Sequence, residues 1–595
     1  MRSTFAGLNT MVRGIFAHQL MQDTTGHNIV NAGTEGYSRQ RVNLTPTQSI
    51  QQASYLGKVE VGTGVDAMSI TRARSIYADK QFRQETANDN YLKAIQVNYD
   101  KLEAIFDDSS GIGVQNAMMQ FYQSWVDLSA NASSTANRIN VVEQGKVVSD
   151  VFQYGTMQLQ NQIEATYDQM RIRLDEVNAL TDKIINVNQQ IAAREVVGVN
   201  ANDLRDQRDL LVDDLSQYME VVITEQPDGK FTINSEGITL VNGIAKLTLS
   251  LSNGVASKDY GVDYGVIDYT IHVDQSDIVY APTTGSLGGD MEAIRISKSY
   301  IDDIAAMSAF MLTTFNEQHK AGYGLIKSNS EQDSSYYTGV NFYGNNNVTY
   351  IFQRDEFGHD YVLTYREYPD NSGEYRACTT DGSFETRTGA PIEDGVTNRL
   401  SGSAIIDAMR VNARLYQPDG SNLIAAKQTS DDDTADGRNA VLLSDLFNTS
   451  GAEHTGYVKE EDITKYEKLL NLKSTLSDGN MLDGLRISDL YTQKNLDGTK
   501  ELTRAIRDVS LNAFYNSTMS RLGVDAETVD VKLETQDTVM TQIRNWRDSE
   551  QGVDWNEELT NMLRFQKGFV ACSRMLTTMD EMLDRLVNGT GVVGR

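Results

Sequence analysis

Cysteine is nearly absent from this chain of 595 residues, which holds only Cys378 and Cys572. A disulfide framework and a zinc ribbon are therefore excluded. Six histidines are scattered along the chain and none begins an H-E-x-x-H motif, so local hydrogen bonding explains them better than a metal site does. No apolar run approaches the roughly 18–20 residues that a membrane helix needs. The first 16 residues also lack the continuous apolar segment of a standard secretory signal.

Positive charge is scarce as well. Lysine and arginine number 53 against 82 aspartates and glutamates, which gives a net charge of −29. Because such a chain repels phosphate backbones, a general nucleic-acid binder is excluded. Hydrophobic residues make up 40% of the chain, enough for packed cores, and its length predicts about two to four domains.

Prolines number only six, and residues 47–226 and 419–595 contain none. Since proline breaks helix interiors, these two tracts permit long helices. The middle of the chain is instead rich in Gly, Asn, Asp and Thr, with β-type runs at 350–352 and 360–365. The sequence therefore predicts a multidomain α+β protein with helical ends around β-rich insertions.

Heptad patterns support the helical ends. Near the C-terminus an apolar stripe predicts a helix over about 555–588, about 50 Å long, with one seam made for another helix. The stripe consists of Met562, Phe565, Phe569, Cys572, Leu576, Met579, Leu583 and Leu586. Two internal stripes, over 163–191 and 92–106, are best interpreted as core packing within one domain.

A shorter stripe, Phe5, Leu8, Val12 and Ile15, lies at the N-terminus. Neither terminal stripe has an obvious partner helix nearby in sequence, so we expect the two to pair, as a coiled coil, with each other. Residues 1–60 carry a net charge of +2 and residues 551–595 carry −1, which leaves −30 for the remainder. Near-neutral, striped ends suit burial between subunits, whereas the acidic centre suits solvent.

Local turn and helix signals set the expected domain boundaries. Residues 226–230, Gln-Pro-Asp-Gly-Lys, predict a turn between two strands, and residues 290–320 return to a helical pattern. We expect residues 1–60 with 551–595 to form an inner terminal coiled-coil domain. Residues 61–220, 290–322 and 501–550 would form a helical domain. Residues 221–289 would form a β-rich insertion and residues 323–500 a variable β-rich outer domain.

Catalytic motifs find no support. Gly62, Gly64 and Ala67 fit a dinucleotide loop superficially, but the polar helical pattern that follows favours a hairpin turn. The acidic run 431–436 fails as a calcium loop because Leu443 stands where the closing glutamate belongs. Neither a G-x-S-x-G elbow nor a P-loop is present. We predict no enzyme, no cofactor and no metal, catalytic or cofactor-binding residue.

The informative segment follows the first stripe and reads Asn28-Ile-Val-Asn-Ala-Gly-Thr-Glu-Gly-Tyr-Ser-Arg-Gln40. Its Gly and Asn residues are typical of a loop that ends a helix. It resembles the N-I-A-N-x-x-T-x-G-Y-S-R-Q signature of flagellar axial proteins, in the version of the hook-associated members, with Val30 in place of the usual alanine. Rod and hook proteins share its first half but typically continue differently.

Three further stretches resemble the same family in the expected order. They are Asn202-Asp-Leu-Arg-Asp-Gln-Arg-Asp209, then Phe315-Asn-Glu-Gln-His-Lys-Ala-Gly-Tyr323, and the C-terminal tracts around 552–558, 562–570 and 577–583. The likeness covers roughly 1–240, 285–325 and 505–588. Most of 325–500 matches nothing specific except 436–443, and the tail 588–595 has no counterpart.

The resemblance implies a structural subunit at the distal end of the hook, on which the filament is built. Its implied partners are further copies of itself, hook protein, a second junction protein and thereby the filament, an export chaperone and the type III export apparatus. It implies an extracellular place in the bacterial flagellum, reached without a cleaved signal peptide, and neither nucleic-acid binding nor membrane insertion. The subunit interface is predicted at Phe5, Leu8, Val12, Ile15, Asn28, Asn31, Gly36, Tyr37, Arg39, Met562, Phe565, Phe569, Leu576, Met579, Leu583 and Leu586.

Two alternatives stay open at this point. One is another axial protein such as hook protein, which Ser38, Arg39 and Gln40 disfavour. The other is a surface glycan-binding function in the 325–500 insertion, suggested by Tyr336, Tyr337, Tyr343 and the asparagines at 345–347, since aromatic and amide groups can hold sugars.

Overall fold

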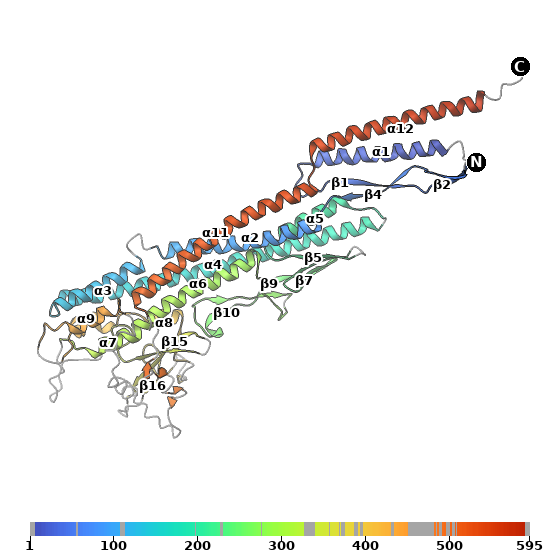
Figure 1. Cartoon of the computed structure of the whole chain (residues 1–595). Coiled ribbons are helices and arrows are strands. Elements are labelled where there is room, and N and C mark those ends of the chain that lie inside the picture. Colours follow the sequence, from blue (N-terminus) through green and yellow to red (C-terminus); the bar gives the residue numbers. More distant parts are fainter. Residues whose placement is uncertain are drawn as a thin grey trace, which may run out of the picture.

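The computed structural model describes residues 6–589 except 55–56, 108–112, 197, 227–229, 275, 326–339, 356–357, 368, 370–374, 386–390, 393–396, 430–432, 450–480, 483–484, 487–490, 495–499, 503–505 and 507–508. The molecule is elongated, and its first and last described helices lie at the same end of it (Figure 1). Phe5, Tyr336, Tyr337 and the tail 590–595 lie outside the described residues.

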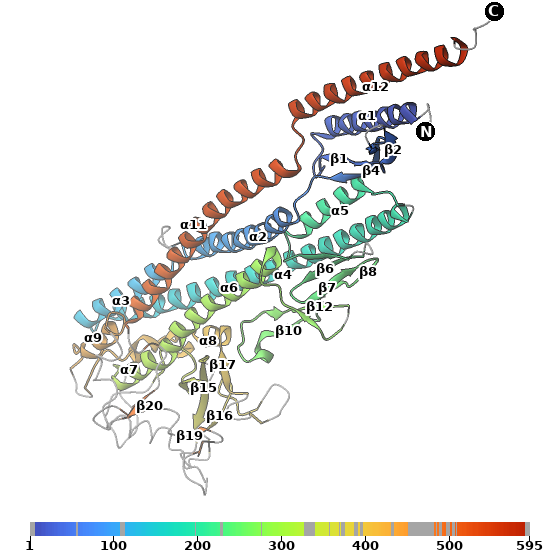
Figure 2. The ribbon, with the colours of Figure 1, turned by 45° about the vertical axis from the view of Figure 1, so that its right-hand side comes forward.

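The two terminal helices form one end of the molecule. Helix α1 (Ala6–Asn31) and helix α12 (Trp555–Gly589) lie side by side although more than 500 residues separate them (Figures 1 and 2). Beneath α1, strand β1 (Gln40–Pro46) pairs antiparallel with β4 (Val65–Arg72), and β2 (Ile50–Ser54) pairs with β3 (Gly57–Val61). We call α1, α12 and β1–β4 the terminal unit. The segment 62–67, predicted as a hairpin turn, forms no hairpin: residues 62–64 join β3 to β4, which pair with β2 and β1, and residues 65–67 belong to β4.

Long helices form the middle of the molecule, which we call the rod. It contains α2 (Ile76–Ile105), α3 (Val114–Ala130), α4 (Thr135–Glu195), α5 (Asn202–Leu215), α6 (Gly285–Phe310) and α11 (Leu511–Gln551). Serines cap three of these helices: the side chains of Ser75, Ser134 and Ser510 each accept a hydrogen bond from a backbone N–H of the first turn. Helix α4 has 61 residues, as the absence of proline permits, and the stripe predicted over 163–191 faces the core.

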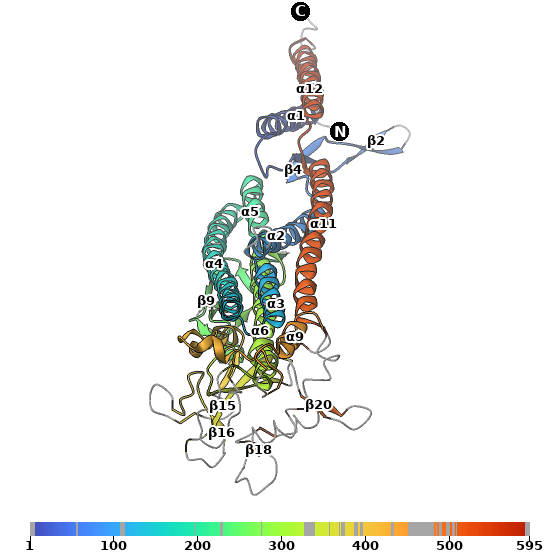
Figure 3. The same ribbon diagram turned by 90° about the vertical axis from the view of Figure 1, so that its left-hand side faces the viewer.

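Small sheets flank the rod near α5 (Figures 1 and 3). The first has four strands in sequence order: β5 (Val222–Glu225), β6 (Phe231–Ser235), β7 (Ile238–Asn242) and β8 (Ala245–Lys246). A three-stranded sheet has the order β13 (Val279–Tyr280), β12 (Ile271–Val273), β9 (Leu249–Leu251), and β10 (Val255–Ala256) pairs with β11 (Ile267–Asp268). The guanidinium of Arg208 on α5 lies 3.8 Å from the ring centre of Phe231, which fixes the first sheet to the rod.

The described part of the outer insertion lies at the end of the rod opposite the terminal unit (Figure 1). Its sheet has the order β14 (Thr349–Arg354), β15 (Asp360–Glu367), β16 (Tyr375–Ala377), with β17 (Arg399–Ser401) also paired to β15. The runs predicted at 350–352 and 360–365 thus pair with each other. Short helices accompany the sheet, namely α7 (Asn316–Ala321), α8 (Ser403–Ala408) and α9 (Arg438–Asp445). Two further hairpins are β18 (Met481–Leu482) with β19 (Leu485–Arg486) and β20 (Tyr491–Lys494) with β21 (Lys500–Leu502).

The stretch 315–323 attaches the outer insertion to the rod. The side-chain oxygen of Asn316 accepts the backbone N–H groups of Phe342 and Tyr343, each at 2.9 Å. The fully buried His319 contacts the carbonyl of Val340 through Nδ1 at 2.9 Å and accepts the N–H of Ala425 through Nε2 at 3.0 Å. A ring that donates from one nitrogen and accepts at the other must be neutral, and burial lowers the pKa of His319 to about 4.

Two residues considered for other functions have structural roles here. Tyr343 is fully buried and its hydroxyl donates to the carbonyl of Gly145, so it is not available to a sugar. Asp436 accepts hydrogen bonds from the Arg438 side chain and from the backbone N–H groups of Arg438 and Gln428. These bonds hold the pKa of its carboxyl well below the usual range. Its carboxylate shapes the local turn, so calcium is not needed to explain it.

Candidate functional site: the terminal helices and their joint with the rod

The seam between α1 and α12 follows the predicted stripe. Met562, Phe565, Phe569, Cys572, Leu576, Met579 and Leu583 are all half-buried, whereas Leu586 is 57% exposed. Glycines on α1 receive sulfur-containing side chains of α12: Gly7 lies against Met579, and Gly14 lies against Cys572. On α1, Leu8, Val12 and Ile15 are half-buried too. A seam that is only half covered by one helix pair leaves apolar surface for further helices.

The segment that follows α1 is organised by Asn28. This side chain is buried, and its Nδ2 donates to the carbonyl of Gln40 at 2.9 Å and to Glu558 Oε2 at 3.0 Å. Its Oδ1 accepts the hydroxyl of Tyr37 at 2.8 Å and the backbone N–H of Gln40 at 2.9 Å. All four hydrogen-bonding positions of the amide are therefore used, and they join α1, the loop, β1 and α12.

Arg39 links the same loop to the first turn of α12. Its Nε donates to Glu558 Oε1 at 2.9 Å, and its Nη2 lies 2.6 Å from Glu557 Oε1. The two glutamates differ greatly in environment, because the side chain of Glu558 is 2% exposed and that of Glu557 is 55% exposed. The backbone N–H of Arg39 also donates to the carbonyl of Gln551, the last residue of α11.

The stretch 202–209 on α5 contacts this loop and β4. The backbone N–H of Ser38 donates to Asp206 Oδ2 at 2.9 Å, and the amide of Gln40 donates to Asp203 Oδ1 at 2.7 Å. Asn202 donates to the carbonyl of Ile70 in β4 at 3.0 Å. Two motifs more than 160 residues apart in sequence are therefore halves of one hydrogen-bonded joint.

Buried ion pairs extend the joint into the rod. Arg72 of β4 contacts both Asp206 and Asp209 of α5, at 2.7 and 2.8 Å. Arg74 pairs with Asp79 and Asp209, Arg83 pairs with Asp213, and Arg547 of α11 bridges Asp79 to Asp213. Burial alone would raise the pKa of Asp209, but the guanidiniums of Arg74, Arg72 and Arg83 outweigh it and hold that pKa below its usual value. The network ties β4, α2, α5 and α11 together.

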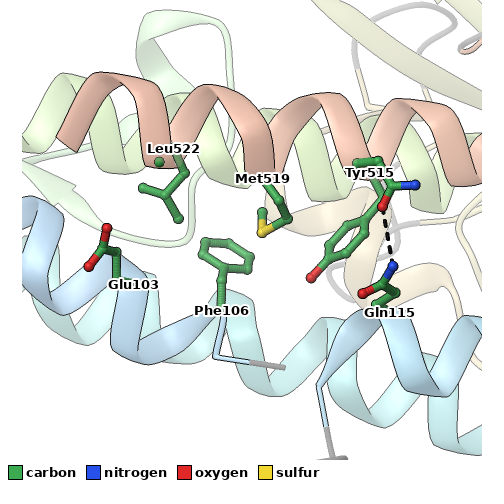
Figure 4. Close-up of a pocket in the computed structure, with 8 residues that line it drawn as sticks. Glu103, Phe106, Gln115, Tyr515, Met519 and Leu522 are labelled. Carbon is green, nitrogen blue, oxygen red and sulfur yellow. Dashed lines mark hydrogen bonds between the residues drawn. The ribbon is translucent and has the colours of Figure 1, made fainter. Parts of the chain in front are cut away.

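The cavity near the far end of α11 lacks catalytic groups among its described lining residues. It has a volume of about 260 Å³ and lies between α11 and the ends of α2 and α3, where Phe106, Met519 and Leu522 face each other (Figure 4). At its other end Gln115 donates to Asn516 at 3.3 Å, and Glu103 is its only carboxylate. Such a lining offers no acid–base pair. Within the described ranges no group of three or more His, Cys, Asp or Glu side chains could hold a metal ion, and no helix is long and apolar enough to cross a membrane.

Known flagellar proteins are similar to this chain. The family model described as flagellar hook-associated protein FlgK helical domain matches residues 99–333, which span most of the rod. A second model, flagellar basal body rod FlgEFG protein C-terminal, matches residues 549–589, which contain α12 and the end of α11. Flagellar hook-associated protein 1 of Bacillus subtilis is 24% identical and aligns over 100% of both chains, and that of Escherichia coli is 23% identical over 98% of this chain and 99% of its own. From end to end, the chain is similar to flagellar hook-associated protein 1.

The fold agrees with this family. The structure of the flagellar hook junction protein FlgK from Burkholderia pseudomallei superposes with a TM-score of 0.50 at 14% identity, covering 79% of this chain and 100% of that one. The predicted helix-rich architecture with some β-sheets is confirmed at this level.

Five predicted interface residues lie at the end of α1 or in the loop that follows it. The polar groups of Asn28, Tyr37 and Arg39 are engaged within one chain, as described above. Asn31 donates a hydrogen bond to the carbonyl of His27 at 3.0 Å. Gly36 has a φ of +75°, and a Cβ at this position would lie 3.2 Å from the side chain of Leu210. Their further part in a contact between subunits stays a prediction.

Sequence reasoning named both motifs of the joint but missed most of the charged residues that connect them to α12, β4 and α11. It did not single out Glu558, Arg72, Arg74 or Arg547. A signal was present in α5, since Asp206, Asp209 and Asp213 follow the i, i+3, i+7 spacing of one helix face. Three carboxylates on one face, within a segment that also packs apolar residues inward, indicate buried cations nearby.

Proposed function

We propose that this chain is a structural subunit of the bacterial flagellum that assembles at the distal end of the hook and forms the junction on which the filament is built. The observation that carries the proposal is the end-to-end likeness to hook-associated protein 1 relatives, over 98–100% of the chain. A whole-length match extends to the terminal helices as well as to the rod. It therefore favours a subunit with the same assembly role over an unrelated protein that shares one domain.

The terminal unit suits this role physically. The half-covered seam of α1 and α12 needs neighbours, and identical neighbours are available in a ring of subunits. We infer that α1 and α12 pack as a coiled coil in the inner wall of the assembly, with the seam residues and Leu586 at the contact between subunits. The acidic rod and the outer insertion then face solvent.

The partners follow from this place in the flagellum. We infer contacts with further copies of the chain, with hook protein below and with a second junction protein that carries the filament above. Export through the flagellar type III apparatus with a chaperone, and no enzymatic activity, belong to the same proposal. Among the alternatives, hook protein is disfavoured by the match over 99–333 to a hook-associated helical domain.

Deletion of the gene tests the proposal. We expect cells with normal hooks, no attached filaments and monomeric flagellin in the medium, seen by electron microscopy and by assay of the medium. Filaments that remain attached to normal hooks would contradict the junction role.

The seam has its own test in Leu576→Asp. Leu576 lies half-buried on α12 against α1, so a carboxylate there would be desolvated without a partner. We expect the rod and outer insertion to stay folded by circular dichroism while attached filaments disappear. A variant that builds normal filaments would show that this seam is not the interface.

A further inference from the structure

An open cleft of about 510 Å³ lies at the joint, outside the seam described above. Its walls come from α2, α5, the second half of α11 and the loop at Glu35 and Gly36 that joins α1 to β1. This volume falls within the range of roughly 300–1,000 Å³ that is typical of binding sites for small groups.

The charges of the cleft are unbalanced. Lys93 is neutralised by Asp89 at 2.6 Å, and Arg547 is neutralised by Asp79 and Asp213. In the part of the chain that the structure describes, three further carboxylates of the cleft form no ion pair, against one unpaired cation. They are Glu35, Asp214 and Asp548, and the cation is Arg544.

Two buried polar atoms in the same cleft have no hydrogen-bond partner. They are Oγ1 of Thr86 and Oε1 of Gln551, in side chains that are 7% and 8% exposed. Leaving a buried acceptor unsatisfied is unfavourable, so such atoms point to a donor that arrives from outside. Unpaired carboxylates and free acceptors together fit a ligand that is positively charged and donates hydrogen bonds, which describes a guanidinium or an ammonium group.

The environment of Asp214 also favours a cationic ligand. Burial raises the pKa of its carboxyl, and the neighbouring carboxylates Asp213 and Glu35 raise it further, against a smaller lowering by Lys183. The charged form of Asp214 is therefore less stable in the folded chain than in water, and an incoming cation would stabilise it.

We propose that this cleft receives a cationic side chain from the terminal unit of a second copy of the chain. The choice of a second copy rests on the proposed function, which requires many copies side by side, and on charge. The terminal unit is the part of the chain that is not strongly acidic, with +2 over residues 1–60 against −30 over residues 61–550. Within the described residues it presents exposed cations without an ion pair, namely Arg41, Arg564, Lys567, Arg574 and Arg585.

Asp214→Asn separates assembly from folding. Because the charged form of Asp214 is less stable in the folded chain than in water, we expect this isosteric change to leave the melting temperature of the purified monomer equal or higher. We expect the amount of the chain on isolated hooks, measured by immunoblot, to fall about tenfold, since each subunit loses a partner for a desolvated cation. Asp175→Asn, the same change at an exposed position of α4, is the matched control and should alter neither quantity.

Charge reversal then identifies the partner. Asp214→Lys should abolish attached filaments, and reversal to Glu at one of the five terminal cations should restore them. If the wild-type chain is found on hooks and Asp214→Asn assembles normally, this inference is wrong and the junction role is unaffected. Failure of all five reversals to rescue would overturn the second copy as occupant. Absence of the wild-type chain from hooks would instead overturn the proposed function.

Discussion

The joint between the terminal unit and the rod makes a quantitative test possible, because two adjacent glutamates contact one arginine in different environments. Glu558 is buried and holds Arg39 and Asn28 at 2.8–3.0 Å, whereas Glu557 is mostly exposed and holds only Arg39. We consider Glu558→Gln, which keeps the size of the side chain and removes its charge. One end of the new amide is a donor and must face a donor of Arg39 or Asn28.

The expected magnitude follows from burial. Removing the buried charge of Glu558 costs about 1.5–3 kcal/mol, because donors of Arg39 and Asn28 lose a charged acceptor while Glu557 still neutralises Arg39. Removing an exposed one costs about 0–1 kcal/mol. Glu558→Gln should therefore shift the equilibrium between closed and open joint by roughly one to two orders of magnitude, and Glu557→Gln by less than about tenfold.

Hydrogen exchange of the loop amides measures this equilibrium. The N–H groups of Ser38, Arg39 and Gln40 donate to Asp206, to the carbonyl of Gln551 and to Asn28, so they exchange only when the joint opens. We expect much faster exchange at these three amides in Glu558→Gln and near wild-type exchange in Glu557→Gln. Equal exchange in the two variants would refute the argument from burial.

Two further outcomes are expected. Gly568→Ala should destabilise the α1–α12 pair by up to about 2 kcal/mol in thermal melts followed at 222 nm. The added Cβ would lie 2.4 Å from His18 Cε1, so overpacking outweighs the gain of about 1 kcal/mol in helix propensity. The control Gly523→Ala on α11, with no atom within 4 Å of the new Cβ, should instead stabilise the chain, and stabilisation by both changes would mean that α1 and α12 do not pair. The free energy of unfolding of the outer insertion should fall by about 3 kcal/mol as the pH falls from 6.5 to about 4. In that pH window His319 of the unfolded chain binds a proton, whereas the buried, neutral His319 of the folded chain does not. Urea unfolding measures this loss through the fluorescence of Trp125, in a chain whose other tryptophans are replaced by phenylalanine. If the free energy of unfolding depends on pH as steeply in His319→Gln as in the wild type, other groups cause the loss.

What the sequence determined by itself was the local periodic structure. The heptad stripe over 562–586 predicted a helix over 555–588, and α12 spans Trp555–Gly589. The stripe over 163–191 likewise lies on the buried face of α4. Such predictions succeed because a helix repeats every 3.6 residues, so one stretch of chain carries its own evidence. The division into four domains stays a prediction.

Tertiary structure alone decided which polar groups meet. Glu557 and Glu558 are identical neighbours in sequence, yet only Glu558 is buried against Asn28, 530 positions away. The loop motif at 28–40 and the aspartates of α5 are each recognisable, but nothing in either stretch names the other as its partner. Likewise β1 pairs with β4 across the β2–β3 hairpin. Contacts between distant segments depend on how whole elements dock, and the direction of a single polar side chain at such a contact leaves no periodic trace in the sequence.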